Sequence, residues 1–355
     1  GVSGGEEGAR WGPSLMPGGP KEAYVELESM LTAIAATSDS GPTVTHVGPG
    51  GSGHYVKMIH NGIEYGDMQL IAETYDIMRN VLDMSAPEIG EVFERWNEGK
   101  LRSFLVEITA KVLKYIDPLS DKPLVDVIAD QAAQKGTGRW TSQNSYELGT
   151  PIPIIDAAVT ARSLSSFKDA RAEASQLLKG PDPADAEVQD REQTIAALED
   201  ALYVAKVASY AQGMNLLRTA SVTYDWNLNL SELARIWKAG CIIRADLLDP
   251  IMKAYNDDPD LSNLMLSPYF VDDVNAGMPA LRSVLGAAIS FGIPAPAMSA
   301  AVNYFDTIRQ IALPANLIQG LRDFFGAHTY QRIDREGTFH TEWMEVYPDA
   351  EVIPE

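Results

Sequence analysis

Apolar residues recur at three- and four-residue spacing through most of the chain, and this period predicts a mainly helical protein. The clearest segments are 54–82, 86–97, 101–115, 124–134, 154–178 and 188–214, and others continue to about residue 318. Up to about residue 53 the chain is rich in Gly and Pro, with one helical segment, 21–36, and one β-like run, 43–47. We therefore expect a small α/β piece followed by a large helical domain.

The period weakens in two places. Residues 178–188 combine Gly, Pro and acidic residues, which predicts a solvated loop between helices. From Arg332 the apolar period fades, and residues 334–355 are acidic with scattered aromatics such as Phe339 and Trp343. We expect this last part to be an extended tail that docks on another surface.

Composition narrows the classes of function. The 355 residues include 28 Lys and Arg against 49 Asp and Glu, a net charge of −21, which repels nucleic acid and anionic membranes. An anionic ligand therefore needs a local cationic pocket. Cys241 is the only cysteine, which excludes an intrachain disulfide and favours a cytoplasmic protein. The most apolar stretch, 284–305, is interrupted by Gly and Pro and does not predict a membrane span.

The most informative helix carries Lys57, His60, Asn61 and Glu64 at positions i, i+3, i+4 and i+7, so that they share one face. An amine, an imidazole, an amide and a carboxylate on a rigid wall supply a proton acceptor and a proton donor. A solvated helix face with a pair between Lys57 and Glu64 has the same pattern. Spacing alone leaves both interpretations open.

Two glycine-rich segments lead into predicted helices. The segment QKGTGRWT, residues 134–141, lacks the spacing of a nucleotide phosphate loop; it is either a binding loop that presents Lys135 or a helix-capping turn. Gly48 to Gly53 has the G-x-G-x-x-G spacing, but no βαβ unit follows it. We interpret it as a flexible entry with Ser52 near a helix N-terminus.

A segment near the end, 313–330, places Arg322 and His328 beside an aromatic cluster. Arginine suits bidentate recognition of phosphate or carboxylate, but an ordinary helix with a salt bridge from Arg322 to Asp323 fits the pattern as well. The histidines show no metal-ligand spacing, and Cys241, in an apolar run, is predicted to be a small buried hydrophobe.

The chain resembles the family of 6-phosphogluconate dehydrogenases, the decarboxylating enzymes of the pentose phosphate pathway, in nine segments that occur in the family's order. The segments are GVSGGEEGAR, GPSLMPGG, GHYVKMIHNGIEYGDMQLI, FLVEIT, QKGTGRWT, ARSLSSFKDAR, YAQG, GCIIR and LPANLIQGLRDFFGAHTY. The resemblance implies a mainly α fold of three parts: 1–50, a residual end of a Rossmann-type coenzyme domain; 51–309, an all-helical substrate and dimerisation domain; and 310–355, a segment and tail docking on the partner subunit.

The resemblance also implies the reaction. A hydride passes from C3 of 6-phosphogluconate to NADP, CO2 is lost, and protonation of the enediol at C1 gives ribulose 5-phosphate, without a metal. Lys57 is implied to be the base at the C3 hydroxyl and Glu64 the acid at C1. The residues implied to bind substrate are Ser3, Gly4, Gly5, His60, Asn61, Tyr65, Lys135, Arg162, Arg322 and His328. The last five of these lie on the phosphate side, and Arg322 and His328 complete the pocket of the partner in a homodimer.

One departure from the family qualifies this picture. The family's coenzyme domain begins with a βαβ unit carrying a glycine fingerprint, and this sequence shows no counterpart. We expect an N-terminally truncated chain that does not catalyse efficient hydride transfer by itself. Two alternatives stay open: a catalytically silent dimerisation module, and a related β-hydroxyacid dehydrogenase for a smaller acid. The cations Lys135, Arg162 and Arg322 argue against the second.

Overall fold

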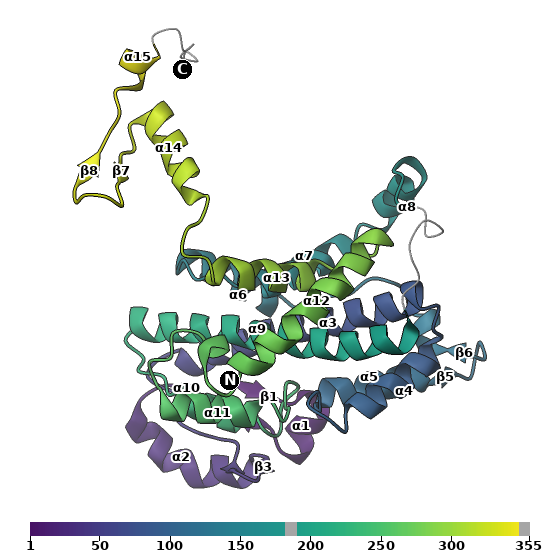
Figure 1. Cartoon of the computed structure of the whole chain (residues 1–355). Helices are drawn as coiled ribbons and strands as arrows, with labels where there is room; N and C mark the ends of the chain where they lie inside the picture. Colours follow the sequence, from purple (N-terminus) through teal and green to yellow (C-terminus); the bar gives the residue numbers. More distant parts are fainter. Residues whose placement is uncertain (182–189, 348–355) are drawn as a thin grey trace. The chain divides into compact units, whose positions relative to one another are not determined.

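The computed structural model describes residues 1–181 and 190–347, and most of them are helical (Figure 1). The chain divides into two compact units, Gly1–Tyr304 and Phe305–Glu355. Most of the predicted loop 178–188 lies outside the described residues. No helix of the described ranges is both long and apolar enough to cross a membrane.

The first unit begins with short elements around a small core. They are β1 (Val2–Ser3), α1 (Gly5–Trp11), β2 (Ser14–Leu15), α2 (Lys21–Ile34), β3 (Thr37–Ser38) and β4 (Gly41–Pro42). β1 pairs with β2 and β3 with β4, both antiparallel. The strand predicted over 43–47 does not form: Val44 makes only an isolated parallel bridge to Leu15, beside which Tyr24 of α2 is also buried. Residues 43–47 are apolar enough to be buried, but no neighbouring strand pairs with them beyond this one bridge.

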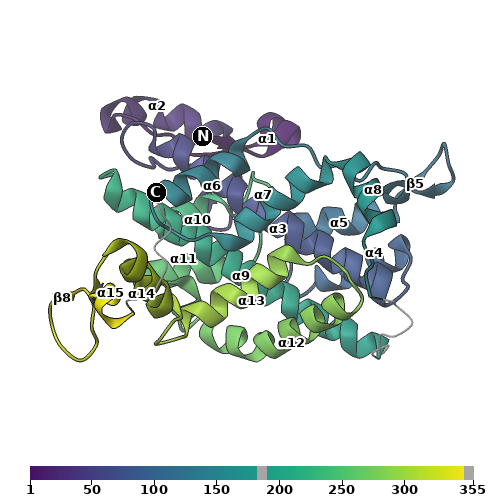
Figure 2. The ribbon, with the colours of Figure 1, turned by 90° about the horizontal axis from the view of Figure 1, so that it is seen from above.

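Two long helices form the centre of this unit. α3 (Ser52–Val81) packs along α9 (Arg191–Thr223), and α12 (Val271–Ser290) packs on α9 in turn (Figures 1 and 2). Glycines allow the close approach of α3 and α9: a Cβ on Gly66 would lie 2.5 Å from Ser209 Oγ, and one on Gly213 would lie 2.4 Å from Ile63. Residue numbers in α9 decrease from Gly213 to Ser209 as those in α3 increase from Ile63 to Gly66, so the two helices are antiparallel.

The remaining helices surround this pair. They are α4 (Ala86–Trp96), α5 (Phe104–Lys114), α6 (Thr137–Glu147), α7 (Pro153–Ser165), α8 (Lys168–Leu177), α10 (Leu230–Ile236), α11 (Leu248–Asp257) and α13 (Pro296–Ile308), with the 3₁₀ turns η1 (Leu124–Asp126) and η3 (Leu264–Leu266) and the hairpin β5 (Ile116–Asp117) to β6 (Lys122–Pro123). Glu73 of α3 accepts hydrogen bonds from the backbone amides of Ala297 and Met298 at 2.8 and 2.9 Å and so caps α13.

Two helix predictions are wrong in their extent. Over 124–134 only η1 forms, because Val127 and Ile128 are 46% and 56% exposed and give a helix no apolar face to pack. The segment 154–178 divides into α7 and α8, where Ser165 and Ser166 hydroxyls donate to backbone carbonyls of the preceding turn.

The second unit is organised by one carboxylate. Its elements are α14 (Ala315–Gly326), β7 (Tyr330–Gln331), β8 (Thr338–Phe339) and α15 (Trp343–Val346). Asp323 is fully buried and accepts hydrogen bonds from the Thr329 amide (2.9 Å), the Trp343 indole (2.9 Å) and His340 Nδ1 (2.9 Å). Residues 340–343 therefore fold back on α14, and the extended conformation predicted from Arg332 onward is wrong for this part of the tail; its docking on another surface stays a prediction.

The structure also shows which side chain Arg322 contacts. The alternative of a salt bridge between Arg322 and Asp323 is wrong, because Arg322 donates to Gln319 Oε1 at 3.0 Å instead. Asp323 points into the unit and Arg322 is exposed, as expected for adjacent positions about 100° apart on a helix.

Candidate active site

α3 brings four predicted residues onto one wall, and β1 adds a fifth. Lys57 Nζ donates to Ser3 Oγ at 3.1 Å and to Asn61 Oδ1, and lies 3.3 Å from His60 Nδ1. Glu64 Oε2 lies 3.9 Å from the same His60 nitrogen. The alternative of a solvated helix face does not fit, since His60 is fully buried and the Glu64 side chain is only 18% exposed.

His60 is held between the N-terminal segment and a tryptophan. Ser3 Oγ lies 3.4 Å from His60 Nε2, and the Trp237 ring packs edge-on at 5.4 Å between centroids. Burial, followed by the charge of Lys57, lowers the pKa of His60 well below its usual range. His60 is therefore neutral and acts here as a hydrogen-bonding and packing group.

Burial moves the two candidate proton carriers toward their neutral forms. It lowers the pKa of Lys57, with Glu64 and Cys241 opposing the shift. It raises the pKa of Glu64, with Lys57 and Arg162 opposing and Asp67 adding to the rise. A lysine that loses its proton more readily and a carboxyl that keeps its proton longer suit a base and an acid.

The segment 134–141 provides the turn that begins α6 beside this wall. Gly136 has φ 104° and is the N-cap, a conformation that favours glycine. Asn61 Nδ2 donates to Thr137 Oγ1 at 3.0 Å, and the Thr141 hydroxyl donates to the carbonyl of Met58 at 3.0 Å. The capping-turn interpretation is confirmed, and the turn also presents Lys135, which is exposed.

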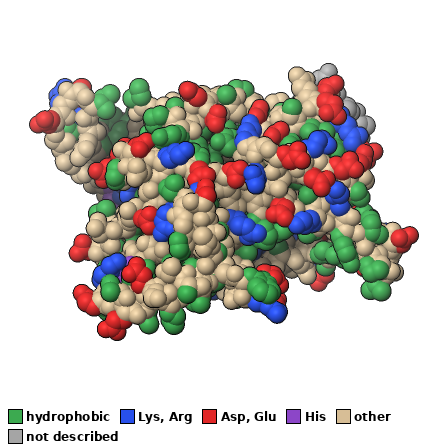
Figure 3. Space-filling model, turned by 90° about the horizontal axis from the view of Figure 1, so that it is seen from below, with side chains coloured by type: hydrophobic (Ala, Val, Ile, Leu, Met, Phe, Trp, Pro, Cys, Tyr) green, Lys and Arg blue, Asp and Glu red, His purple; other side chains and the backbone are tan. Residues whose placement is uncertain are grey.

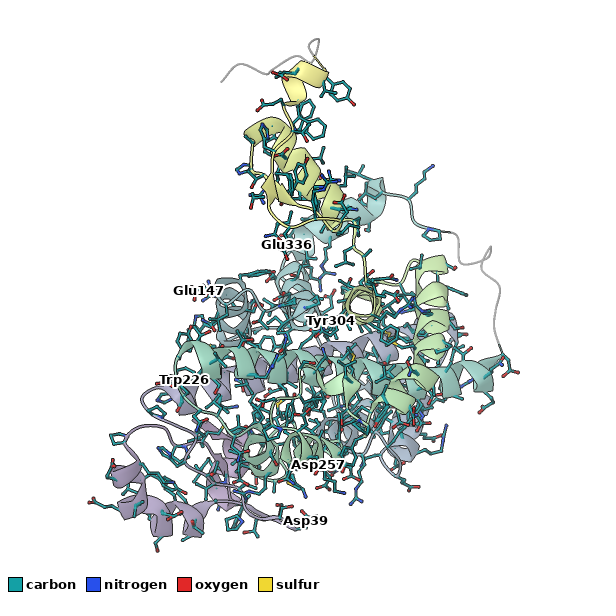
Figure 4. All side chains as sticks on the ribbon, turned by 60° about the vertical axis from the view of Figure 1, so that its left-hand side comes forward. Asp39, Glu147, Trp226, Asp257, Tyr304 and Glu336 are labelled. Atoms are coloured by element: carbon teal, nitrogen blue, oxygen red, sulfur yellow. The ribbon has the colours of Figure 1, made fainter. Side chains whose placement is uncertain are left out.

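The far end of α6 is fixed by aromatic side chains. Tyr55 of α3 donates its hydroxyl to Asn144 Oδ1 at 2.5 Å, and its ring contacts those of Tyr224 and Trp226. Figure 4 labels Trp226 after α9 and Glu147, the last residue of α6. α6 is thereby held to α3 near both of its ends.

Tyr65 and Arg162 form a stacked pair on the same side of α3. The Arg162 guanidinium lies 3.6 Å from the centroid of the Tyr65 ring, a cation–π geometry. Burial lowers the pKa of Arg162, although Tyr65 and Glu64 oppose this. Gly138 fits under the ring, since a Cβ there would lie 2.5 Å from two ring carbons. α6 and α7 thus present a cation close to Glu64.

Gly4 and Gly5 shape the segment that carries Ser3. Their φ values are 124° and 62°, and a Cβ on Gly4 would lie 2.6 Å from the carbonyl oxygen of Gly240. Cys241, next in the chain, is fully buried and donates its thiol to the carbonyl of Trp237 at 3.0 Å, which confirms the prediction for that cysteine.

Arg322 and His328 lie in the second unit. Both are exposed, and the His328 ring contacts Phe325 at 6.1 Å between centroids. Their contribution to a pocket stays a prediction. No group of three or more His, Cys, Asp or Glu side chains in the described ranges is arranged to hold a metal ion.

Three contacts of the site had no separate signal in the sequence. Thr137 bonds Asn61, Trp237 packs on His60 and Gly138 supports the Tyr65 ring. Thr137 and Gly138 belong to the glycine-rich segment, whose position beside α3 is set by tertiary contacts. Trp237 lies in an apolar run and was not distinguishable from other core residues.

The surface charge agrees with the need for a local cationic pocket. Figure 3 shows basic and acidic side chains interspersed over the face seen from below, although the net charge is −21. The charge on this face therefore gives no extended cationic surface, and an anionic ligand would need particular cations.

Comparison with known proteins agrees with the resemblance. Residues 53–343 match the family model described as 6-phosphogluconate dehydrogenase, C-terminal domain, and residues 1–48 match the NAD binding domain of 6-phosphogluconate dehydrogenase. The chain is 52% identical to the NADP(+)-dependent, decarboxylating 6-phosphogluconate dehydrogenase of Bacillus subtilis and 52% identical to the decarboxylating enzyme of Escherichia coli. Each match covers 97% of this chain and 73% of the relative.

A solved structure is similar over the same extent. The 6-phosphogluconate dehydrogenase of Plasmodium falciparum, studied in its apo form and in complex with NADP+ and with 6-phosphogluconate, superposes with a TM-score of 0.93 at 48% identity. The match covers 97% of this chain and 73% of that one.

Proposed function

The chain belongs to the 6-phosphogluconate dehydrogenase family, and from this premise we propose that it supplies the substrate site for the NADP-dependent oxidative decarboxylation of 6-phosphogluconate to ribulose 5-phosphate. The observation that carries the proposal is the buried wall of α3, on which Lys57 and Glu64 have pKa values shifted toward their neutral forms. Ser3 and Asn61 already bond Lys57 there.

The two groups divide the proton transfers between them. Neutral Lys57 accepts the proton of the C3 hydroxyl as the C3 hydride leaves, and NADP, when bound, is the acceptor of that hydride. Loss of CO2 from the 3-keto acid places its electron pair in an enediol, while Lys57 returns its proton to the carbonyl oxygen. Glu64 then donates its proton to C1, while Lys57 takes the proton of the enediol hydroxyl that becomes the C2 carbonyl of the product. Lys57 therefore ends protonated and Glu64 ends as a carboxylate, and transfer of one proton from Lys57 to Glu64 by way of solvent restores both groups.

We assign no residue to the nucleotide. The described residues 1–48 contain two-stranded antiparallel ladders and, on either side of α2, only the isolated parallel bridges of Leu15 with Val44 and Gly18 with Gly48, not the paired parallel strands of a unit that cradles a dinucleotide pyrophosphate. The residues present in that stretch therefore do not identify the NADP contacts, and the proton transfers of Lys57 and Glu64 are the steps that this chain's side chains account for.

The substrate phosphate is proposed to bind beside Tyr65 through Lys135 and Arg162, with Arg322 and His328 contributed across a homodimer. Arg162 supports this because it is half-buried over Tyr65, near Glu64. The boundaries 1–50, 51–309 and 310–355 remain our proposed division into coenzyme-domain part, substrate domain and docking segment.

One experiment tests the site without the nucleotide. If Glu64 protonates C1, microscopic reversibility requires its carboxylate to remove a proton from C1 of ribulose 5-phosphate while Lys57 protonates the C2 carbonyl. In D2O the purified chain should therefore exchange one C1 hydrogen for deuterium, measured by proton NMR. A calorimetric titration with 6-phosphogluconate, and with gluconate as the phosphate-free control, tests the substrate. A folded chain that does not exchange would contradict the proposal, and one that also fails to bind would favour a silent dimerisation module.

A further inference from the structure

A buried ion pair lies directly behind the candidate acid. Lys206 Nζ of α9 is 2.5 Å from Asp67 Oδ1 of α3, and the two side chains are only 3% and 2% exposed. Asp67 follows Glu64 by three residues, so it is one helical turn away on the same helix. None of the proton transfers proposed above uses either residue.

The pair lies beside the glycine contacts between α3 and α9. Lys206 precedes by one turn Ser209, whose hydroxyl faces Gly66, and Gly213 beyond it faces Ile63. These two glycine contacts, at Ile63 and at Gly66, lie just before and just after Glu64 in α3 and fix the spacing of the two helices there. The distance between the Asp67 and Glu64 carboxyl groups is therefore fixed as well, which would not hold for an ion pair in a loosely packed or solvated place.

The surroundings of Glu64 give this charge a specific effect. The ionisable groups around Glu64 are Lys57, His60 and Asp67 on α3, Arg162 on α7, Tyr210 on α9 and Cys241 in the following loop. Burial makes the largest contribution and raises the pKa of Glu64; Lys57 and Arg162 lower it, and the charge of Asp67 adds to the rise. The charge of Asp67 thus opposes two cations that favour the carboxylate, the form that cannot donate a proton.

We propose that Lys206 and Asp67 are positioning residues for Glu64: their buried ion pair fixes a negative charge one helical turn behind the carboxyl and keeps it competent as the acid. The inference rests on the proposed function, because it concerns the proton that Glu64 gives to C1. Burying an ion pair is costly, and hydrophobic residues of similar volume often replace one without loss of stability, which leaves room for a role in the site.

The test is the pH profile of C1 deuterium exchange on ribulose 5-phosphate. In the double variant Asp67→Asn with Lys206→Met, both charges are removed together, so no unpaired buried charge remains. The exchange reaction starts from the Glu64 carboxylate, and the midpoint of its rise should move to lower pH by ~0.5 to 1 unit. A purely structural role for the pair would change the rate or the melting temperature without moving the midpoint.

The single variants Asp67→Asn and Lys206→Met keep the test decisive if the double variant folds poorly. Each leaves one buried partner, which becomes neutral in preference to remaining an unpaired charge, so the same downward shift is expected. The matched control is Lys100→Met with Asp200→Asn, which removes an exposed ion pair between the turn after α4 and α9. Its side chains are 42% and 47% exposed, and the midpoint of this variant should not move.

The outcomes separate the two proposals. Exchange by the unaltered chain with an unchanged midpoint in every folded variant would overturn the positioning role and leave the proposed function intact. Absence of exchange in the unaltered chain would overturn both. A shift in the Asp67 and Lys206 variants and not in the control would support both.

Discussion

The two compact units use ionisable groups in opposite ways. In Gly1–Tyr304, burial shifts Lys57 and Glu64 toward neutrality, and the groups around them are fixed by packed helices. In Phe305–Glu355, Asp323 is kept as an anion: burial alone would raise its pKa, but hydrogen bonds from His340 and Trp343 lower it to about 2. The first arrangement suits proton transfer, and the second holds a fold together.

The units also differ in what covers their apolar side chains. Among residues 305–347, Asp323 is the one fully buried side chain, while α14 exposes Leu317, Ile318, Leu321 and Phe325 by 53% or more. A helix with an uncovered apolar face and an anionic anchor has little core of its own. This difference supports the proposed docking of the second unit on a partner subunit.

Replacing the candidate base should have the largest effect. Lys57→Met keeps the stem of the side chain but removes the amine, and we expect C1 exchange on ribulose 5-phosphate to fall about 10²- to 10⁴-fold, the usual contribution of a general acid or base. Calorimetry should still show binding of 6-phosphogluconate. Exchange at the unaltered rate in the folded variant would remove Lys57 from the mechanism.

The matched control distinguishes lost chemistry from lost structure. Lys100→Met removes an exposed amine that pairs with Asp200 outside the site, and its exchange rate should equal that of the unaltered chain. A similar loss in both variants would mean that the assay reports general damage and not the role of Lys57.

The position of Lys57 shows how far the sequence could lead. The apolar period predicted a helix over 54–82, and the structure has Ser52–Val81, because a helix packed on several sides carries a strong pattern. The spacing of the polar residues also predicted that Lys57 and Glu64 share one helix face. It could not predict that this face is buried, because a buried and a solvated polar face have the same spacing.

Contacts between distant segments account for what the sequence could not predict. Asn61 meets Thr137 across 76 residues, and Lys206 meets Asp67 across 139. In the second unit, the charge and the fading period from Arg332 onward indicated an extended chain, but hydrogen bonds to the Asp323 carboxylate fold residues 340–343 back on α14. No periodicity encodes such partners.

The next largest effect is expected at Glu73, a buried carboxyl group of the first unit that takes no part in the proposed proton transfers. Burial raises the pKa of Glu73 to about 7, although the amides of Ala297 and Met298 and the side chain of Gln69 oppose the shift. The folded state therefore holds this proton up to higher pH than the unfolded state, whose ordinary value is 4.5. The free energy of unfolding should fall as the pH rises from about 4.5 to about 7, by a total of about 3 kcal/mol for this group.

Urea unfolding of Glu73→Gln measures this contribution. The amide cannot ionise, so the variant should lose that part of the pH dependence, whatever its stability at a single pH. The control Glu88→Gln removes an exposed carboxylate whose pKa is lowered to about 2 by bonds to Ser85 and Arg191, and it should leave the slope between pH 4.5 and 7 unchanged. Identical slopes for the unaltered chain and Glu73→Gln would refute the assignment.

A smaller effect is expected at the phosphate side of the site. In Gly138→Ala the added Cβ would overlap the Tyr65 ring, which must move and carry Arg162 with it. We expect about tenfold weaker binding of 6-phosphogluconate, from partial loss of a charge-assisted contact, with little change for gluconate. Gly136→Ala is unsuitable as a control because of its φ of 104°, whereas Gly286→Ala has open space around its Cβ. Equal affinities in all three proteins would exclude Arg162 from the phosphate site.

The smallest effect is expected from the ion pair of His340 with Asp323 in the second unit. The bond to Asp323 raises the pKa of His340 above its ordinary 6.5, so the ion pair contributes fully below pH 6.5 and its contribution is lost as the pH rises through the raised value. Hydrogen exchange of residues 329–347, corrected for intrinsic rates, should show protection falling by a factor of ~2 to 5 over this range, as expected for a partly exposed pair. In His340→Gln that fall should disappear, while peptides of α3 keep the same protection in both proteins. A pH-independent protection of the unaltered segment would mean that the Trp343 and backbone bonds to Asp323 hold the unit without the charge of His340.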